Sequence, residues 1–260
     1  MKFQKSTISF SVILILVFLG LFQSCKTIKV QEKWAFAPSK YSKEQLDKNL
    51  EKSTVSSTDK ELNQKSIETI LNTDNEFIIE KENIKLSRHF YLINDTISIE
   101  YFVFQPEKTN KVGLFYMGNS SNIFDFVDNL FMLSSQTKSK IYVINYRGYG
   151  KSKGTPSFST QFSDNSLITN EIIQKQNKLD FVIGFSLGSV FASYTATENK
   201  TDALYLLAPF SNTKELFKYF KKQNTRGVKA LFRPFIKFSA DEYLLNVSNT
   251  EKIKSYKGKL

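Results

Sequence analysis

The sequence is short of the residues from which many functional sites are built. Its 260 residues include one cysteine, one histidine and one tryptophan. A single cysteine excludes a disulfide within the chain, and one cysteine with one histidine leaves too few ligands for a zinc site made by the protein alone. We therefore expect neither a bound metal nor a cofactor.

Signatures of nucleic-acid binding are also missing, although the formal net charge is +11. No aromatic RNA-binding motif, helix-turn-helix pattern or zinc-finger spacing is present. The positive charge is spread over isolated lysines, with one local concentration between Lys214 and Lys229. Such an excess suits anionic lipid headgroups or acidic polysaccharide equally well, so nucleic acid is not an expected partner.

Apolar residues are plentiful and their order along the chain indicates the fold class. The length suffices for one α/β domain with a smaller appendage. Continuous apolar runs, typical of parallel strands covered on both faces, alternate with helical patterns. The expected strands include 97–104, 111–116, 140–144, 179–183 and 202–207, and the expected helices include 123–133 and 163–176. This alternation predicts an α/β protein with a doubly wound, mostly parallel sheet.

The N-terminus has the layout of a signal peptide. Lys2 and Lys5 precede an uncharged apolar run over 8–22, which Ser24 and Cys25 follow. A cysteine directly after a small residue resembles the bacterial lipobox, although Gln23 stands where a smaller residue is usual. We expect cleavage after residue 24, lipidation of Cys25 and anchoring to a bacterial envelope membrane. An uncleaved single-span anchor or a lipid-free secreted form are alternatives, and all three place the domain outside the cytoplasm.

Domain organisation follows from the change in composition along the chain. Residues 1–24 form the expected signal peptide, and the polar, lysine-rich residues 25–75 are expected to be a tether. Within the tether, Trp34–Pro38 form an apolar knot that we expect to pack on the domain. Residues 76–260 make up the α/β domain. Residues 211–250, rich in Phe and Lys, are the expected lid over a substrate pocket.

The stretch Gly184-Phe185-Ser186-Leu187-Gly188 carries the strongest functional signal. An apolar run precedes it, and a run with helical character follows it. Strand, tight turn and helix is the setting in which a GxSxG motif holds a nucleophilic serine. The two glycines are required because strand and helix almost touch at this turn. We therefore predict that Ser186 is a catalytic nucleophile; a serine in an ordinary strand-to-helix turn is the alternative.

Three motifs together resemble the small α/β-hydrolases of the serine aminopeptidase and acyl-thioesterase-like branch. They are Met117-Gly118-Asn119, Asn145–Ser152 and the GFSLG stretch, and each follows an expected strand. The resemblance covers about residues 76–260. It implies that Ser186 is the nucleophile and that the backbone N–H groups of Asn119 and Leu187 form the oxyanion hole. It further implies hydrolysis of an ester, thioester or amide in a small acyl or aminoacyl substrate through an acyl-enzyme. Met117 replaces a histidine that is usual in the family but lies outside its catalytic triad.

The Asn145–Ser152 stretch has two interpretations. In the family it is a structural turn, with Arg147 anchoring loops. Its end, Gly150-Lys151-Ser152, also echoes a phosphate-binding loop, but Asn145 stands where that motif needs glycine and no helix is expected directly after Lys151. The structural turn is the interpretation we adopt.

The partners of a serine nucleophile are not evident in the sequence. The family order is serine, acid, histidine, whereas the single histidine, His89, lies far upstream of Ser186. Asp241 and Glu242 are expected to cap a helix, and residues 254–260 look like the start of the strand that precedes the acid. We favour a C-terminally truncated hydrolase, which should be poorly soluble and unreactive toward fluorophosphonates because nothing deprotonates Ser186. A catalytically inactive binding or scaffolding module is the alternative.

Overall fold

The computed structural model describes residues 26–30, 35–42, 44, 68–73, 77–81, 83–224, 236–240, 244 and 246–260. Cys25, Trp34, Asp241 and Glu242 lie outside these residues, so the predictions made for them receive no structural account. Across the ranges given above, no helix combines the length and the apolar character that crossing a bilayer requires.

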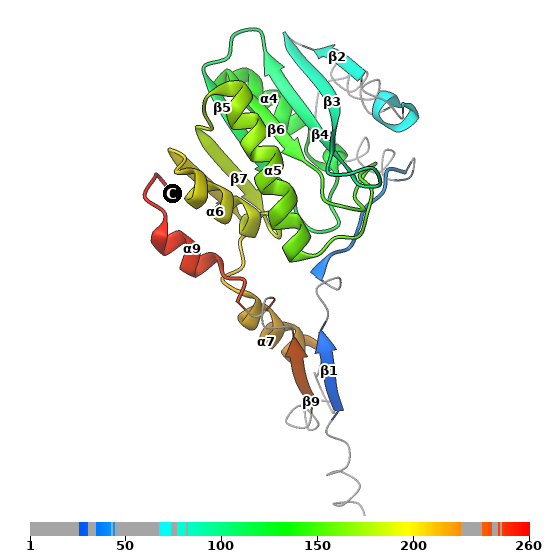
Figure 1. Ribbon diagram of the computed structural model, residues 1–260, viewed down its shortest axis with the longest axis vertical. Helices are drawn as coiled ribbons and strands as arrows, with labels where there is room; N and C mark the ends of the chain where they lie inside the picture. Colours follow the sequence, from blue (N-terminus) through cyan, green and yellow to red (C-terminus); the bar gives the residue numbers. More distant parts are fainter. Residues whose placement is uncertain are drawn as a thin grey trace, which may run out of the picture.

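A seven-stranded sheet forms the centre of the molecule (Figure 1). Its strands in spatial order are β2 (Phe77–Lys81), β3 (Ile84–Leu92), β4 (Ser98–Pro106), β6 (Ser139–Ile144), β5 (Lys111–Tyr116), β7 (Phe181–Phe185) and β8 (Ala203–Leu207). Strands β6, β5, β7 and β8 run parallel, while β2, β3 and β4 add an antiparallel edge. The α/β class and the mostly parallel sheet are confirmed.

Helices cover both faces of the parallel strands, which explains the continuous apolar runs in the sequence. Along β5, Val112, Leu114 and Tyr116 enter the core on one face, whereas Phe115 enters the core on the other. The first core includes residues of α5 (Phe158–Gln176), α6 (Gly188–Asn199) and α9 (Asn249–Ser255). The second includes residues of the 3₁₀ helix η2 (Ile123–Asp125) and of α4 (Val127–Thr137). The sheet is therefore doubly wound, as predicted.

Helix α5 begins five residues earlier than the expected start at Ser163. Ser157 caps it: its hydroxyl accepts a hydrogen bond from the Thr160 N–H at 3.1 Å, and its own N–H donates to the Thr160 hydroxyl at 3.0 Å. This reciprocal capping box satisfies donors that a helix start would otherwise leave unpaired. The apolar periodicity used for the prediction does not extend into the capped turn.

Parts of the segment expected to be a tether pack against the domain. Phe36 is buried, and its ring lies 5.2 Å from that of Phe158 and 6.4 Å from that of Phe191. Ile70, in a helical stretch over 68–72, is completely buried in the other core. Apolar side chains in an otherwise polar segment thus bury themselves against the helices and the sheet.

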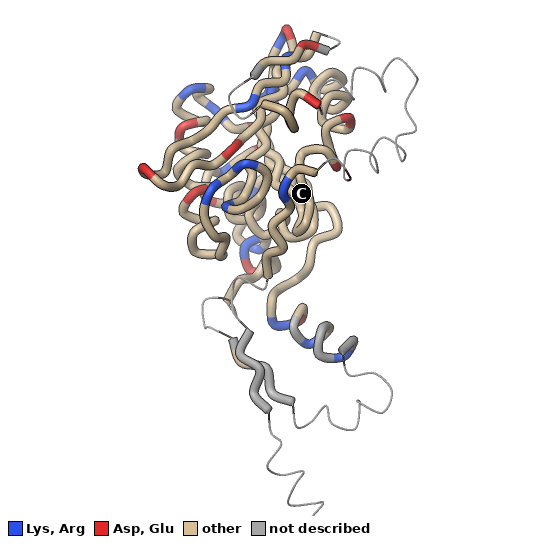
Figure 2. Tube along the Cα trace, turned by 90° about the vertical axis from the view of Figure 1, so that its right-hand side faces the viewer, with Lys and Arg blue, Asp and Glu red and all other residues tan. Residues whose placement is uncertain are grey.

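The region expected to be a lid contains α7 (Thr213–Asn224) and β9 (Ile236–Ala240). Strand β9 pairs in parallel with β1 (Lys26–Val30), which directly follows Cys25, and Figure 1 shows this pair apart from the large sheet. Basic residues are distributed over the whole fold and recur along α7 (Figure 2). On α7, Lys218 forms an ion pair with Glu215 at 2.6 Å, so one charge of the basic cluster expected here is neutralised by an acid on the same helix.

The expectation of a strand over 254–260 is correct only for its end. Lys254 and Ser255 form the last turn of α9, which begins after the cap at Ser248 and ends where the Tyr256 N–H donates to the Ile253 carbonyl at 3.1 Å. Lys259 forms an isolated parallel bridge with Ala203 of β8; its carbonyl accepts from the Leu204 N–H at 2.8 Å. Along the rest of β8, Tyr205 and Leu207 remain about half exposed.

Candidate active site

Ser186 occupies a strained turn between β7 and α6. Strand β7 ends at Phe185, α6 begins at Gly188, and Ser186 adopts φ +51°. A left-handed backbone costs a residue other than glycine about 1–2 kcal/mol. Its N–H donates to the Leu207 carbonyl of β8 at 2.8 Å and its carbonyl accepts from the Ser189 N–H at 3.0 Å, so backbone bonds on both sides hold the turn. Such strain maintained by the surroundings is typical of functional sites.

The glycines of the motif allow the close approach that the sequence predicted. A Cβ atom on Gly184 would lie 2.6 Å from the Gly188 carbonyl oxygen and from the Ala192 side chain. A Cβ atom on Gly188 would overlap the carbonyl oxygen of Tyr116, the last residue of β5. The turn after β7 therefore touches the end of β5.

This contact brings the two expected oxyanion donors to the same edge of the sheet. Leu187 directly follows the serine, and Asn119 lies three residues beyond the end of β5. Within the described residues, neither backbone N–H donates a hydrogen bond to the protein. Unpaired backbone N–H groups of this kind are the donors from which oxyanion holes are built.

The side chain of Asn119 is fixed by residues from two other segments. Its Oδ1 accepts from the Ala37 N–H at 2.7 Å, from the Tyr149 hydroxyl at 2.7 Å and from the Ser120 N–H at 3.1 Å. Burial raises the pKa of Tyr149 to about 12, so its hydroxyl keeps the proton that it donates at neutral pH. Sequence reasoning missed this anchor because no local pattern links Ala37, Asn119 and Tyr149.

The geometry agrees with a family relationship. The model of the family described as serine aminopeptidase, S33, matches residues 122–258, more than half of the chain. The chain belongs to this family of α/β-hydrolases. Its family membership makes it a hydrolase.

Solved structures of α/β-hydrolases also resemble this chain at low sequence identity. Acetyl xylan esterase 1 from Thermoanaerobacterium sp. JW/SL YS485 is 14% identical, with a TM-score of 0.47 over 82% of this chain and 89% of that one. An esterase from Pyrococcus furiosus is 16% identical, with a TM-score of 0.49 over 67% of each chain. A carboxyl esterase from Bacillus coagulans is 16% identical, with a TM-score of 0.43 over 57% of this chain and 55% of that one.

The single histidine of this α/β-hydrolase lies away from Ser186. His89 is in β3, which β4, β6 and β5 separate from β7. Its Nε2 is 2.8 Å from the Ser87 hydroxyl, and its ring stacks on Tyr101 at 5.2 Å. The structure therefore does not bring His89 to Ser186, in agreement with the position of His89 in the chain order.

The Asn145–Ser152 stretch is a structural turn, as predicted. Arg147 donates two hydrogen bonds to the carboxylate of Asp164 on α5, at 2.7 and 2.8 Å. Lys151 donates through Nζ to the carbonyls of Leu71 and Thr73, so it is not available for a phosphate. The next helix begins at Phe158, well after the lysine, which also excludes the phosphate-loop geometry.

A buried carboxylate holds this turn against the sheet. Glu100 of β4 is completely buried and accepts from the Tyr41 hydroxyl at 2.6 Å, the Asn145 side-chain amide at 2.6 Å and the Lys151 N–H at 2.9 Å. Arg88 forms an ion pair with Glu100, with 3.5 Å between Nη1 and Oε1. Burial raises the pKa of Glu100 above its ordinary value of 4.5, against the opposing effects of these donors. The network joins Tyr41, strand β4 and the Asn145–Ser152 turn, which are far apart in the chain.

Among the residues that the structure describes, no cluster of three or more His, Cys, Asp or Glu side chains could hold a metal ion. The site as described thus offers a serine hydroxyl and backbone donors.

Proposed function

We propose that the protein is a serine hydrolase that cleaves an ester, thioester or amide through an acyl-enzyme on Ser186. The left-handed backbone of Ser186, held between β8 and the first turn of α6, is the observation that supports this most directly. A strained serine at the start of a helix presents its hydroxyl to a bound carbonyl. Membership of a hydrolase family supports the same chemistry.

The proposed reaction has two acyl transfers. The Ser186 oxygen attacks the carbonyl carbon, and the N–H groups of Leu187 and Asn119 stabilise the negative oxygen of the tetrahedral intermediate. Collapse of this intermediate breaks the bond to the leaving group, which takes up the proton lost by Ser186 and departs as the alcohol, thiol or amine. Water then attacks the acyl-enzyme in the same way, which releases the acid and returns the proton to Ser186.

A general base is needed to take the proton of Ser186. The sequence has no histidine besides His89, and His89 lies on β3. We propose that the base acts from outside the residues that the structure describes. With only these residues, Ser186 should react slowly.

A diffusible base should reveal this latent nucleophile. We expect 4-nitrophenyl acetate to acetylate the wild-type chain about tenfold faster in imidazole than in phosphate buffer, since a positioned base contributes about 10²–10⁴-fold. Intact-mass spectrometry and peptide mapping measure the adduct and place it on Ser186.

Two variants make this experiment specific. Ser186→Ala should abolish the imidazole-dependent adduct, whereas Ser135→Ala, at an exposed position of α4, should leave it unchanged. Absence of the adduct from the wild type, or its persistence in Ser186→Ala, would contradict the proposal and favour an inactive binding module. If His89 were the base, the wild type would be acetylated as fast in phosphate as in imidazole, and His89→Gln would lose the adduct in phosphate but regain it in imidazole.

We also propose that the hydrolase is anchored to a membrane of the bacterial cell envelope, outside the cytoplasm, by a lipid on Cys25. The order of basic residues, apolar run, small residue and cysteine at the N-terminus supports this anchor.

Replacing Cys25 tests the anchor separately from the chemistry. Cys25→Ala should retain residues 1–24 and lose labelling by a fatty acid, because both processing and acylation require the thiol. Ser24→Ala keeps a small residue before the cysteine and should be labelled normally. Equal labelling of wild type and Cys25→Ala would contradict the anchor.

A further inference from the structure

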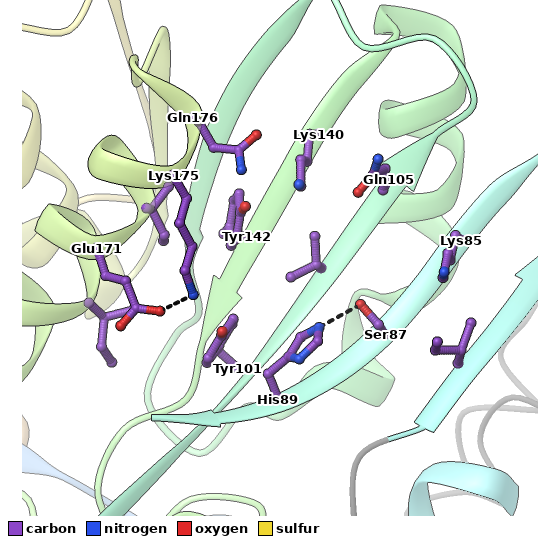
Figure 3. A pocket seen from close by; sticks show the side chains of 14 residues that line it. Lys85, Ser87, His89, Tyr101, Gln105, Lys140, Tyr142, Glu171, Lys175 and Gln176 are labelled. Atoms are coloured by element: carbon purple, nitrogen blue, oxygen red, sulfur yellow. Dashed lines mark hydrogen bonds and ion pairs between the residues drawn. The ribbon is translucent and has the colours of Figure 1, made fainter. Parts of the chain in front are cut away.

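A pocket lies on the antiparallel side of the sheet, away from Ser186. It has a volume of about 370 Å³ and is formed by β3, β4, β6 and the C-terminal half of α5 (Figure 3). Strand β5 separates β6 from β7, which carries the nucleophile at its end. The pocket volume lies within the range of about 300–1,000 Å³ typical of small-molecule sites.

The strand register arranges the pocket floor in rows. Lys85 of β3 pairs with Gln105 of β4, and Lys140 of β6 lies one residue beyond the last pair of β4 and β6, Phe104 with Ile141. Neighbouring strands are about 4.8 Å apart, so the backbones of Lys85 and Lys140 flank Gln105 at about 10 Å from each other. Two long cationic side chains thus border one amide.

The next rows of the floor are less polar. Ser87, Val103 and Tyr142 form the second row, and His89 pairs with Tyr101 in the third. Because side chains alternate between the faces of a strand, these residues share the face on which the lysines stand. The ring of Tyr101 lies 6.4 Å from that of Tyr142, and buried Ile168 and Ile172 of α5 complete an apolar wall.

Positive charge in the pocket exceeds negative charge. The lining contains Lys85, Lys140 and Lys175 and a single carboxylate, Glu171, which forms an ion pair with Lys175. Glu80 of β2 pairs in register with Lys85, although no ion pair joins them, and Lys140 has no ion-pair partner within the described part of the chain.

Lys140 lies where its charged form is disfavoured. Its Nζ lies 5.5 Å from the centre of the Tyr142 ring, and its side chain is half-buried. Burial, followed by the charge of Lys175, lowers the pKa of Lys140. A bound anion would supply the counter-charge that the protein does not provide.

We propose that this pocket binds a small organic anion, with its acidic group among Lys85, Gln105 and Lys140 and its apolar body against Tyr101, Val103 and Tyr142. The lysines and the amide are donors suited to a carboxylate or a phosphate ester. The aromatic and aliphatic wall accommodates a ring or a short chain beside the head group. The site is independent of the chemistry at Ser186.

Soluble naphthalene derivatives test separately whether the acidic group and the apolar body of the ligand are recognised. Isothermal titration calorimetry on the full chain would compare 1-naphthyl phosphate, 1-naphthoate, neutral 1-naphthol and inorganic phosphate. We expect saturable binding at one site for at least one naphthyl anion, and binding weaker by about tenfold or more for naphthol and for inorganic phosphate, because each lacks one half of the recognised chemistry. The better of the two naphthyl anions identifies the preferred acidic group.

Variants assign the binding to this pocket. Lys140→Gln and Lys85→Gln should each weaken binding of the preferred anion about tenfold, since each removes a charged donor. Lys140→Arg keeps the charge and should retain binding, and Lys108→Gln, at an exposed position outside the pocket, should have no effect. Thermal melts verify that every variant is folded. No saturable binding of either anion, equal binding of naphthol, or equal binding by Lys140→Gln would overturn the proposal.

Discussion

Replacing Arg88 with methionine is expected to destabilise the protein by about 3–5 kcal/mol at pH 8, because breaking a buried ion pair leaves an uncompensated charge. Arg88 and Glu100 are both completely buried, 3.5 Å apart. The guanidinium also donates to the carbonyls of Ile70 and Thr73, which would lose this partner. Denaturant unfolding followed by circular dichroism measures the loss.

Arg88→Met should lower the free energy of unfolding by less at pH 5 than at pH 8. Burial already raises the pKa of Glu100 above 4.5, and loss of the Arg88 charge raises it further. A carboxyl group whose pKa is higher in the folded than in the unfolded state binds more protons when folded. Its contribution to stability is therefore greatest at low pH and is lost as the pH rises from 4.5 through the folded pKa. Lys40 and Tyr41 also face this carboxylate, and the substitution leaves both residues unchanged.

A double variant separates the charge effect from lost packing. In the Arg88→Met background, Glu100→Gln removes the orphaned charge, so it should recover part of the stability at pH 8 and flatten the pH dependence. Two results would contradict this account: an equal loss of unfolding free energy in Arg88→Met at both pH values, or a double variant less stable than Arg88→Met at pH 8. Either would mean that the uncompensated charge of Glu100 is not what destabilises Arg88→Met.

Gly188→Ala should be the most damaging single-methyl change at the active site, with a loss of about 3 kcal/mol in unfolding free energy. The added Cβ would overlap the Tyr116 carbonyl oxygen, and backbone atoms of a central strand cannot move aside without disturbing the sheet. The turn at Ser186 would also move away from Asn119, so the imidazole-dependent acetylation of Ser186 should be lost.

Gly113→Ala is the matched comparison, because its added Cβ meets the ring of Phe181 rather than backbone. The Phe181 ring borders a surface pocket beside Tyr205, so a change of its χ1 angle can move it away, and this variant should lose less stability and keep acetylation. The explanation for Gly188 would be wrong if both variants were equally stable or if Gly188→Ala retained the adduct.

Local sequence patterns predicted the parts of the fold that depend on neighbouring residues. The apolar runs over 111–116 and 179–183 predicted strands covered on both faces, because a parallel strand alternates its side chains into two cores. The spacing of Gly184, Ser186 and Gly188 predicted the tight turn, since only glycine permits this approach of strand and helix. Boundaries set by capping, such as the start of α5 at Phe158, were predicted less well.

The sequence by itself thus determined the α/β class, the family and the position of the candidate nucleophile, because short-range spacing encodes strands, helices and the tight turn. Only the tertiary structure decided that Asn119 is held by Ala37 and Tyr149, that Glu100 ties the loops together, and that lysines from β3 and β6 share one pocket. These contacts join residues far apart in the chain. They depend on how the strands are ordered and aligned in the sheet, and the spatial order β4-β6-β5-β7 differs from the order of the strands along the chain.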